Sequence, residues 1–162
     1  MLSIREARPE DASLIVQFIK DLAEYEREPQ AAIVNAADIL RDGFSGHDRK
    51  FWVLIAEWNA EPVGFAFYFF NYSTWLGRPG LYLEDLFVCP SARGKGIGKA
   101  LLARLAQIAI DHNCYGMRWQ VLDWNQPTID FYDSLGGQIM KEWLTVRLMG
   151  EPLKKLAEQS NQ

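Results

Sequence analysis

The most constraining feature of the chain is the segment 82–98, which reads YLEDLFVCPSARGKGIG. An apolar, β-prone run stops at Pro90, and a basic, glycine-rich turn leads into a helix-period segment that starts at Lys99. Gly94, Gly96 and Gly98 lack a Cβ and can adopt positive φ, so several backbone N–H groups can point at one anion. A strand that enters such a loop at a helix N-terminus predicts a pyrophosphate site. The alternative is a tight strand-to-helix turn that merely holds three glycines.

The spacing of the loop excludes the two common nucleotide motifs. A Walker A loop needs a glycine where Arg93 stands and a hydroxyl where Ala100 stands. A Rossmann fingerprint needs a glycine in place of Lys99 and an acidic residue about twenty positions beyond the loop, where the chain has Cys114. The loop therefore indicates a different pyrophosphate ligand.

A second group of signals follows the loop. Asn125 suits a helix N-cap, Pro127 suits the first helical turn, and Gly136 suits the C-terminal stop. These residues predict a short helix over 126–134, after a strand over 117–123. Tyr132 falls near the end of this helix, where it is either a functional hydroxyl or an aromatic residue of the core.

Hydrophobic periodicity predicts the remaining elements of one α/β domain. The expected elements are a strand over 2–8, a helix from residue 10, a helix over 36–43, a hairpin of strands 51–58 and 63–72, a strand over 81–88, a helix over 99–112, an extended segment over 138–149 and a final helical turn or two within 151–158. Asn113 is expected to end its helix in the αL conformation. The stripe of Phe65, Phe67 and Phe69 is interpreted as sheet core.

The composition of the chain indicates its size class and makes several kinds of binding partner improbable. The chain has 162 residues with 49% apolar content, enough for one domain over 1–162 with a sizeable core. A net charge of −4 disfavours nucleic acid or an anionic membrane surface, and no apolar run reaches membrane-spanning length. Cys89 and Cys114 cannot form a disulfide framework, so we expect buried or half-buried thiols in the cytoplasm. His47 and His112 lack a metal-ligand pattern, and no metal site is expected.

The pattern Arg-Gly-x-Gly-Ile-Gly after a strand that holds Glu84 and Asp85, with Asn125 and Tyr132 downstream, resembles the GNAT superfamily of N-acetyltransferases. The resemblance implies an α/β (α+β) fold, whose mixed, mostly antiparallel sheet has six or seven strands. This sheet opens between its fourth and fifth strands and is flanked by about four helices. It also implies acetyl-CoA as the cofactor, held at that opening.

The resemblance extends from residue 4 to about 157 and becomes closer at three segments. Residues 22–26, 42–44 and 82–85 resemble the diamine acetyltransferase group, which includes the spermidine/spermine acetyltransferases. Residues 72–75 and 121–126 resemble its thialysine N-ε-acetyltransferase branch, and the polyamine branch usually has an aspartate where this chain has Ser73. The implied acceptor is thialysine or a lysine-like amine. The alternatives are a diamine or polyamine, a protein amine, or a non-catalytic acyl-CoA-binding module.

The chemistry of the amine sets the roles that the resemblance implies. An alkylammonium has a pKa of about 10 and must lose a proton before it attacks. Glu84 is the implied base. Asp85 can support it only if a β-bulge turns both carboxyls toward one site. The alternative is that the two carboxyls have no catalytic role and form a salt bridge or a solvated strand end. Tyr132 would give its proton to the CoA sulfur, in direct transfer within a ternary complex. The implied cofactor contacts are Leu86, Phe87, Val88, Arg93, Gly94, Lys95, Gly96, Ile97, Gly98, Lys99, Asn125, Gln126, Pro127, Thr128 and Tyr132.

The resemblance also implies the contacts of the amine substrate. They are Tyr25, Glu26, Trp75, Glu84, Asp85, Arg118, Trp119, Gln120 and Glu142. Members of this group are homodimers whose C-terminal segments cross the interface, and the apolar segment 143–149 is compatible with that arrangement.

Overall fold

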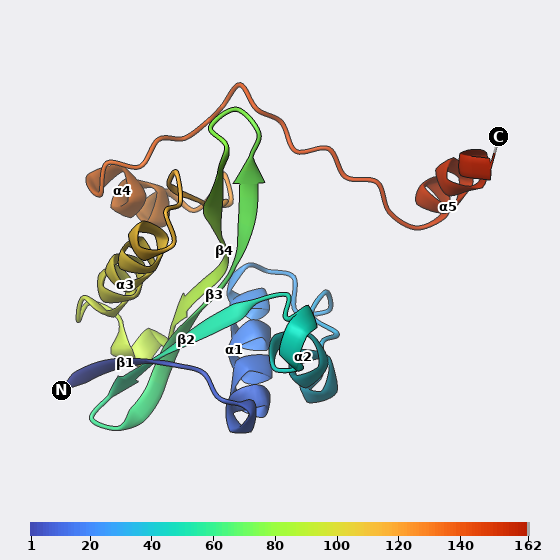
Figure 1. Cartoon of the computed structure of the whole chain (residues 1–162). Helices are drawn as coiled ribbons and strands as arrows, with labels where there is room; N and C mark the ends of the chain where they lie inside the picture. The colour runs from blue at the N-terminus through green and yellow to red at the C-terminus, as the bar shows by residue number, and fades with distance from the viewer. Residues whose placement is uncertain (162) are drawn as a thin grey trace. The chain divides into compact units, whose positions relative to one another are not determined.

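The computed structural model describes residues 1–161 and divides into two compact units, Met1–Leu122 and Asp123–Gln162 (Figure 1). This division does not test the prediction of one domain over 1–162, which stays a prediction. Among the described helices, none combines the length and apolar character that crossing a membrane requires.

The first unit contains the sheet and the helices that cover it (Figure 1). Its elements are β1 (Leu2–Glu6), the 3₁₀ turn η1 (Pro9–Asp11), α1 (Ala12–Tyr25), α2 (Ala36–Gly43), η2 (Gly46–Asp48), β2 (Trp52–Trp58), β3 (Glu61–Ser73), β4 (Arg78–Val88), η3 (Pro90–Ala92), α3 (Ile97–Asp111) and β5 (Met117–Arg118). Asn35 caps α2 as its sequence suggests, because its side chain accepts the amide of Asp38 while the Asp38 carboxylate accepts the amide of Asn35. Asn113 ends α3 with a φ of 54°, as predicted.

The second unit contains α4 (Gln126–Ser134), α5 (Glu151–Ala157) and η4 (Glu158–Asn161). The bounds of α4 agree with the prediction, and Gly136 follows it with a φ of 86°. Residues 138–149 form no strand within the described chain, since a strand exists only where a neighbour completes its hydrogen bonds.

Within residues 1–161 the sheet has five strands in the order β1-β2-β3-β4-β5, so the prediction of six or seven strands is wrong. The described chain has five α-helices where about four were expected. Successive pairs from β1 to β4 are antiparallel, and β4 pairs with β5 in parallel. The strand predicted over 117–123 shrinks to two residues, because only Leu81 and Tyr82 of β4 find partners in it. The mixed sheet that opens between its fourth and fifth strands is thus confirmed.

Helices cover both faces of the sheet, with α1 on one face and α3 on the other (Figure 1). On one face, Phe18 of α1 stacks on Phe65 of β3 with ring centroids 5.4 Å apart, and Phe67 stacks on Phe51 at 4.1 Å. The buried residues of this core are Ala12, Ile15, Phe18, Leu22, Ile39, Phe51, Val53, Ile55, Phe65 and Phe87, with Phe67, Phe69 and Cys89 packed against them. The phenylalanine stripe is therefore sheet core, as predicted. α3 contacts the sheet through buried side chains such as Leu101 and Leu105.

A β-bulge interrupts β4 at Glu84. Asp85 pairs with Phe67 of β3 and Leu83 pairs with Tyr68, so Glu84 has no opposite residue in β3. The extra residue shifts the alternation of side chains along the strand. Asp85 consequently shares the α1 face with Phe67, while Leu83 is buried with Tyr68. The bulge that was required for Asp85 to share the site is present.

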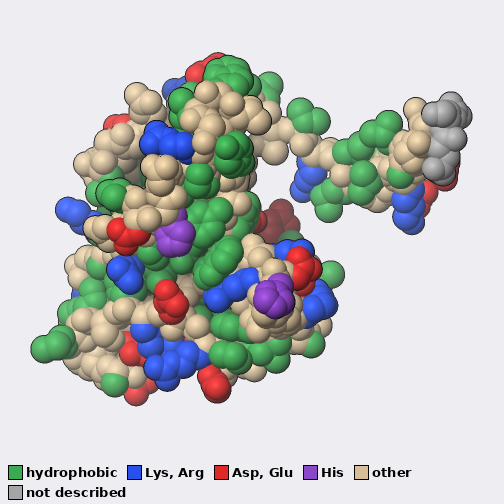
Figure 2. Space-filling view, in the orientation of Figure 1, with side chains coloured by type: hydrophobic (Ala, Val, Ile, Leu, Met, Phe, Trp, Pro, Cys, Tyr) green, Lys and Arg blue, Asp and Glu red, His purple; other side chains and the backbone are tan. Residues whose placement is uncertain are grey.

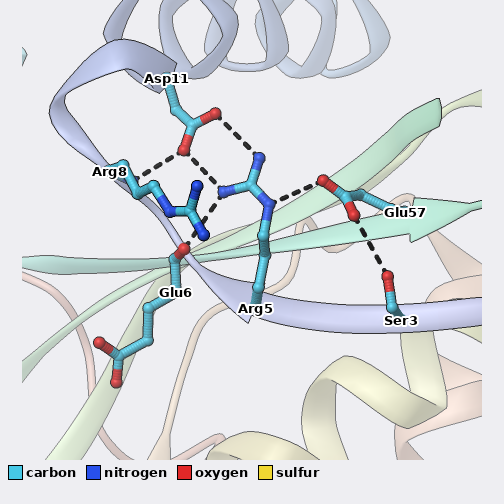
Figure 3. A network of polar contacts seen from close by, with 6 residues as sticks. All are labelled: Ser3, Arg5, Glu6, Arg8, Asp11 and Glu57. Carbon is cyan, nitrogen blue, oxygen red and sulfur yellow. Dashed lines mark hydrogen bonds and ion pairs between the residues drawn. The ribbon is translucent and has the colours of Figure 1, made fainter. Parts of the chain in front are cut away.

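A polar network ties the N-terminal strand to its neighbours (Figure 3). The Arg5 guanidinium donates two hydrogen bonds to Asp11, at 2.8 and 3.0 Å, and its Nε donates to Glu57 at 2.7 Å. Asp11 also accepts the backbone amide of Arg8 at 2.7 Å, and Ser3 donates to Glu57 at 3.2 Å. The network joins β1, β2 and the start of α1, and the hydrogen bonds from Arg5 hold the pKa of Asp11 below its usual range.

Candidate active site

The glycine-rich loop between β4 and α3 has the backbone of an anion cradle. Gly94 and Gly96 both have a φ of 77°, and a Cβ at either position would meet nothing within 4 Å. α3 begins at Ile97, and the first amides of a helix have no partner within the helix. Gly98 does not use this freedom, because it already lies in the first turn of α3. The open loop and the helix N-terminus fit the pyrophosphate of a coenzyme.

The cations of the loop differ in their surroundings. The Nε of Arg93 donates to the carbonyl of Val88 at 2.9 Å, and its Cζ lies 4.8 Å from the ring centroid of Tyr25 and 5.7 Å from that of Phe87. Lys95 lies over the ring of Trp58 at 5.1 Å, and Lys99 is exposed on α3. Arg93 therefore anchors the start of the loop as well as adding positive charge.

The edge of β4 next to the loop is open. β5 pairs with β4 only at Leu81 and Tyr82, and within the described residues no strand covers this edge from Leu83 to Val88. On the other side, Leu86, Phe87 and Val88 pair with β3. The open edge offers backbone amides to an extended ligand that leads from the loop toward the bulge.

The bulge places two carboxyls in different environments. Glu84 is exposed, whereas Asp85 is half-buried on the α1 face. Burial, together with the nearby Glu84 and Glu26 carboxylates, raises the pKa of Asp85 to about 7. A carboxyl in this state can hold or release a proton near neutral pH.

The C-terminal end of α1 supplies the neighbour of Asp85. Glu26 follows the last residue of the helix, Tyr25, and burial raises the pKa of its carboxyl. The helix ends in a Schellman motif, because the amide of Glu28 donates to Ala23 at 2.9 Å and the amide of Arg27 donates to Glu24 at 3.0 Å. Arg27 takes the left-handed φ of 65° that this motif requires. The motif fixes Tyr25 and Glu26 beside the bulge, where two carboxyls favour a cationic ligand.

β5 brings Arg118 beside the same region. Arg118 is in register with Tyr82, whose ring stacks on Phe69 at 5.1 Å. Burial and the Glu84 carboxylate raise the pKa of Tyr82, and the positive charge of Arg118 opposes this shift. Trp119 is half-buried and Gln120 is exposed, both beyond the end of β5. Of the three predicted residues in this segment, Arg118 is the one that the sheet places next to β4.

The β3–β4 hairpin holds Trp75 away from the carboxyls. Ser73 ends β3, its hydroxyl accepts the amide of Leu76 at 3.1 Å, and Trp75 is 89% exposed at the tip. Phe67, the partner of Asp85, and Ser73 are six residue steps apart, which span about 20 Å of strand. Within one chain, Trp75 therefore does not join Asp85 and Glu26.

The remaining predicted residues belong to the second unit. Asn125 is buried, and its carbonyl accepts the amides of Thr128 and Ile129 at 3.1 and 3.0 Å. Tyr132 is 9% exposed on α4, and its ring lies 5.6 Å from that of Phe131. Gln126 and Pro127 begin α4, and Glu142 is exposed in segment 138–149. Their roles toward the coenzyme and the amine stay predictions.

The sequence reasoning missed two aromatic residues. Tyr82 lies between the acidic bulge and Arg118, and Trp58 lies under Lys95. Tyr82 could have been found from the alternation of β4, because it shares its face with Phe69 once the bulge is included. Trp58 carries no local signal, since its contact with Lys95 joins the end of β2 to the loop that follows β4.

A sequence model described as the Acetyltransferase (GNAT) family matches residues 13–136. The chain belongs to this family. Thialysine N-epsilon-acetyltransferase of Bos taurus is 38% identical to this GNAT protein, with 95% of this chain and 96% of that protein covered. Spermidine/spermine N(1)-acetyltransferase-like protein 1 of Homo sapiens is 41% identical over 95% of this chain, but over only 23% of its own length.

A solved structure extends the match to the fold of this GNAT protein. An integron cassette protein from the mobile metagenome of V. cholerae superposes with a TM-score of 0.80 and 31% identity, covering 97% of this chain and 98% of that one. The matched residues 13–136 include the glycine loop, the open edge of β4 and the bulge. The protein is accordingly an acetyl-CoA-dependent acyltransferase of the GNAT type.

Proposed function

We propose that this protein transfers the acetyl group of acetyl-CoA to a primary amine of a small molecule, with thialysine or another lysine-like amine as the leading acceptor. The observation that carries the proposal is the half-buried Asp85 carboxyl beside Glu26, on the strand that leads into the glycine loop. A primary ammonium supplies the positive charge that these carboxyls favour, and it needs a proton acceptor before it can attack. The bovine relative is named for this type of acceptor.

Acetyl-CoA fits the loop and the strand edge of the first unit, and it supplies the acetyl group as a thioester. The backbone amides of the loop and of the first turn of α3 would hold its pyrophosphate, with Lys95 and Lys99 adding charge. The open edge of β4 at Leu86, Phe87 and Val88 would hold its extended arm. The contacts proposed from the second unit are Asn125, Gln126, Pro127, Thr128 and Tyr132, and they depend on the family resemblance.

The proton of the ammonium has two possible acceptors. We assign this role to Asp85, because its pKa of about 7 matches a base that works near neutral pH. Glu84, the base predicted from the sequence, is exposed on the bulge and stays the alternative, directly or through water. The Tyr132 hydroxyl would hold the proton for the departing sulfur, as the resemblance implies. Transfer is then direct, and neither cysteine has a role in it.

A diamine or polyamine is the second candidate acceptor, favoured by the human relative named for spermidine and spermine. Ser73 bears on this choice, because a carboxylate at this position would add an acidic group to the hairpin. In this chain the Ser73 hydroxyl caps the turn instead. The hairpin thus gives a polyamine no additional negative charge at this position.

We further propose a cytoplasmic homodimer. Large apolar side chains are exposed along the C-terminal segment, including Trp143, Leu144 and Val146 at 68%, 85% and 93% (Figure 2). A second copy would cover them and would also give Trp75 a neighbouring site that it does not reach in its own chain. Sedimentation velocity would test this, since Leu144→Ser combined with Val146→Ser should convert a dimer to monomers. A wild-type monomer at micromolar concentration would contradict the dimer.

The function is tested by release of CoA thiol from acetyl-CoA with thialysine, lysine, putrescine, spermidine and a lysine peptide, compared by kcat/KM. Preference for thialysine or lysine supports the leading proposal, and preference for spermidine supports the alternative. Preference for the peptide would indicate a protein substrate. Acetyl-CoA binding without turnover of any amine would indicate a non-catalytic module or an untested acceptor.

A further inference from the structure

Lys95 of the glycine-rich loop contacts Trp58, a residue that lies far from it in the sequence. The Nζ of Lys95 lies 5.1 Å from the centroid of the Trp58 ring, which is the geometry of a cation–π pair. Trp58 is the last residue of β2, and Lys95 lies between Gly94 and Gly96 in the loop that follows β4. The end of β2 therefore takes part in the surroundings of the loop.

The fold holds the two partners of this contact with different firmness. Trp58 is half-buried, and its backbone is paired on both sides, with Leu2 of β1 and Glu61 of β3. Lys95 is exposed on a flexible side chain, and within residues 1–161 its ammonium forms no ion pair with a carboxylate. The indole thus limits the positions of a charge that is still available to an anion, and this lowers the entropy cost of ordering the lysine on binding.

The contact lies on the face of the sheet opposite to α1. Val53 and Ile55 of β2 belong to the core beneath α1, so the alternation of side chains places Trp58 on the face that α3 contacts. Arg93, in contrast, lies over the last residue of α1. The side chains of Arg93 and Lys95 therefore leave the loop toward different faces, and Lys95 is directed away from the acidic end of α1.

The strand directions indicate which half of the coenzyme lies near Trp58. β2 and β4 are both antiparallel to β3, so they run in the same direction and end at the same end of the sheet. The extended arm of CoA proposed along the open edge of β4 leads from the loop back toward the bulge. In CoA the pyrophosphate joins this arm to the 3′-phosphoadenosine. The nucleotide half therefore leaves the loop in the other direction, at the end of the sheet where Trp58 lies.

The nucleotide half of CoA carries a further phosphate, on the 3′-oxygen of its ribose. Only the ribose separates this phosphate from the pyrophosphate, a span similar to the length of a lysine side chain. Lys95 is flanked by the two glycines that shape the anion cradle, so its ammonium lies within reach of a phosphate one ribose away. A lysine ammonium is a common point-charge ligand of phosphate. The amides at the start of α3 and Lys99 are left for the pyrophosphate.

We propose that Lys95 binds the 3′-phosphate of coenzyme A and that Trp58 is the positioning residue that holds the ammonium for it. The inference depends on the coenzyme binding proposed above and adds a site for its nucleotide half. The protein should therefore select coenzyme A over 3′-dephospho-coenzyme A, which has the same arm and the same pyrophosphate. A cradle formed by the loop and the helix N-terminus alone would bind the two ligands alike.

Calorimetry with CoA and with 3′-dephospho-CoA tests the site without turnover. We expect the wild type to bind CoA about 10- to 100-fold more tightly, as for a hydrogen bond between charged groups. Lys95→Met should lose most of this preference, because it weakens CoA binding and leaves the Kd of dephospho-CoA nearly unchanged. Lys99→Met, in the first turn of α3, is the matched control. It should weaken both ligands by the same factor and keep the preference.

Trp58→Leu and Trp58→Phe test the positioning role. Trp58→Leu removes the aromatic face and should reduce the preference for CoA about 3- to 10-fold, through the lost cation–π contact and the freer lysine. Trp58→Phe keeps an aromatic ring and should restore part of the preference. Added to Lys95→Met, Trp58→Leu should cause no further loss of preference, because the two residues act together. In acetyl transfer, both Trp58 variants should raise the KM for acetyl-CoA and leave kcat and the amine KM unchanged.

The two ligands separate failure of this inference from failure of the proposed function. Equal weakening of both ligands in Lys95→Met would assign this lysine to the pyrophosphate and overturn the inference. Equal weakening of both in Trp58→Leu and Trp58→Phe would overturn the positioning role by indicating a structural one. A wild type that binds both ligands equally overturns the 3′-phosphate site, while coenzyme binding and acetyl transfer stand. A wild type that binds neither ligand overturns the coenzyme proposal and this inference together.

Discussion

The guanidinium of Arg93 lies over the ring of Tyr25, with its Cζ 4.8 Å from the ring centroid, while its Nε donates to Val88. This contact connects the first residue of the glycine loop to the last residue of α1. Glu26 follows Tyr25 directly and lies close enough to Asp85 to influence its carboxyl. The glycine-rich loop and the acidic end of α1 are therefore in contact through one cation–aromatic pair.

Arg93→Met tests this link. We expect the CoA Kd and the KM for the amine each to rise about 10-fold, because the variant loses the loop anchor together with its contact to Tyr25. Lys95→Met is the matched control and should weaken CoA binding alone. Calorimetry with CoA and steady-state kinetics measure the two effects. If Arg93→Met changes only the CoA Kd, the contact with Tyr25 has no functional consequence.

Asp85→Asn and Glu84→Gln separate the two candidate bases. If Asp85 accepts the proton, the wild-type rate should rise with pH through about 7, as its carboxyl ionises. Asp85→Asn should lower kcat by about 10²-fold or more and remove this inflection. Glu84→Gln should keep the inflection with a smaller loss. The opposite pattern in a pH–rate series would assign the base to Glu84.

The Asp85 carboxyl should also lower the free energy of unfolding at high pH. The pKa of Asp85 rises from an ordinary value of 3.8 to about 7 on folding, so the folded state binds its proton more tightly than the unfolded state. The contribution of Asp85 is thus most favourable below pH 4 and is lost as the pH rises toward 7. Asp85→Asn should be more stable than wild type at pH 8, by about 2–4 kcal/mol, and the gain should shrink at pH 4. Urea unfolding at both pH values would show a constant difference if Asp85 titrated normally.

The sequence predicted best those elements whose ends are determined by capping residues next to them in the chain. α2 and α4 have the predicted bounds. The side chain of Asn35 caps α2, and α4 follows Asn125 with Pro127 in its first turn. The loop conformation at Gly94 and Gly96 followed from the same kind of signal, since a left-handed turn favours glycine. The two-residue length of β5 could not be predicted, because it depends on where the chain leaves β4.

The candidate site shows the same contrast between features set by local sequence and features set by strand pairing. The sequence indicated the residue types of the acidic bulge and the loop, but not which carboxyl is buried, since that depends on the register of β4 against β3. Tyr82 acquires its place between Glu84 and Arg118 only through the parallel pairing with β5. Trp75 was grouped with these residues, and the length of the hairpin separates it from them within one chain.

Arg5→Met tests the network that joins β1, β2 and the start of α1. The Asp11 and Glu57 carboxylates that Arg5 contacts have side chains only 13% and 20% exposed, so we expect a loss of about 2–3 kcal/mol at pH 7. Arg41→Met is the matched control, because Arg41 also contacts two carboxylates but on the surface, and it should be nearly neutral. The pKa of Asp11 is lowered on folding, so its contribution is present above pH 4 and disappears as the pH falls further. Chemical unfolding of Arg5→Met should therefore differ less from wild type at pH 2.5 than at pH 7, and an equal difference would exclude the Asp11 pairing as the cause.

Tyr132→Phe tests the proton donor proposed for the departing sulfur. The hydroxyl is the only group removed, so kcat should fall about 10-fold or more while the CoA Kd changes less than about twofold. Tyr72→Phe, at an exposed tyrosine of β3, is the matched control and should behave as wild type. A donor to the leaving thiolate also predicts that the loss shrinks with an acyl thioester whose thiol is more acidic, because such a thiolate needs less protonation. An unchanged kcat in Tyr132→Phe, measured with acetyl-CoA and the preferred amine, would remove Tyr132 from the chemistry and leave its burial on α4 as a packing role.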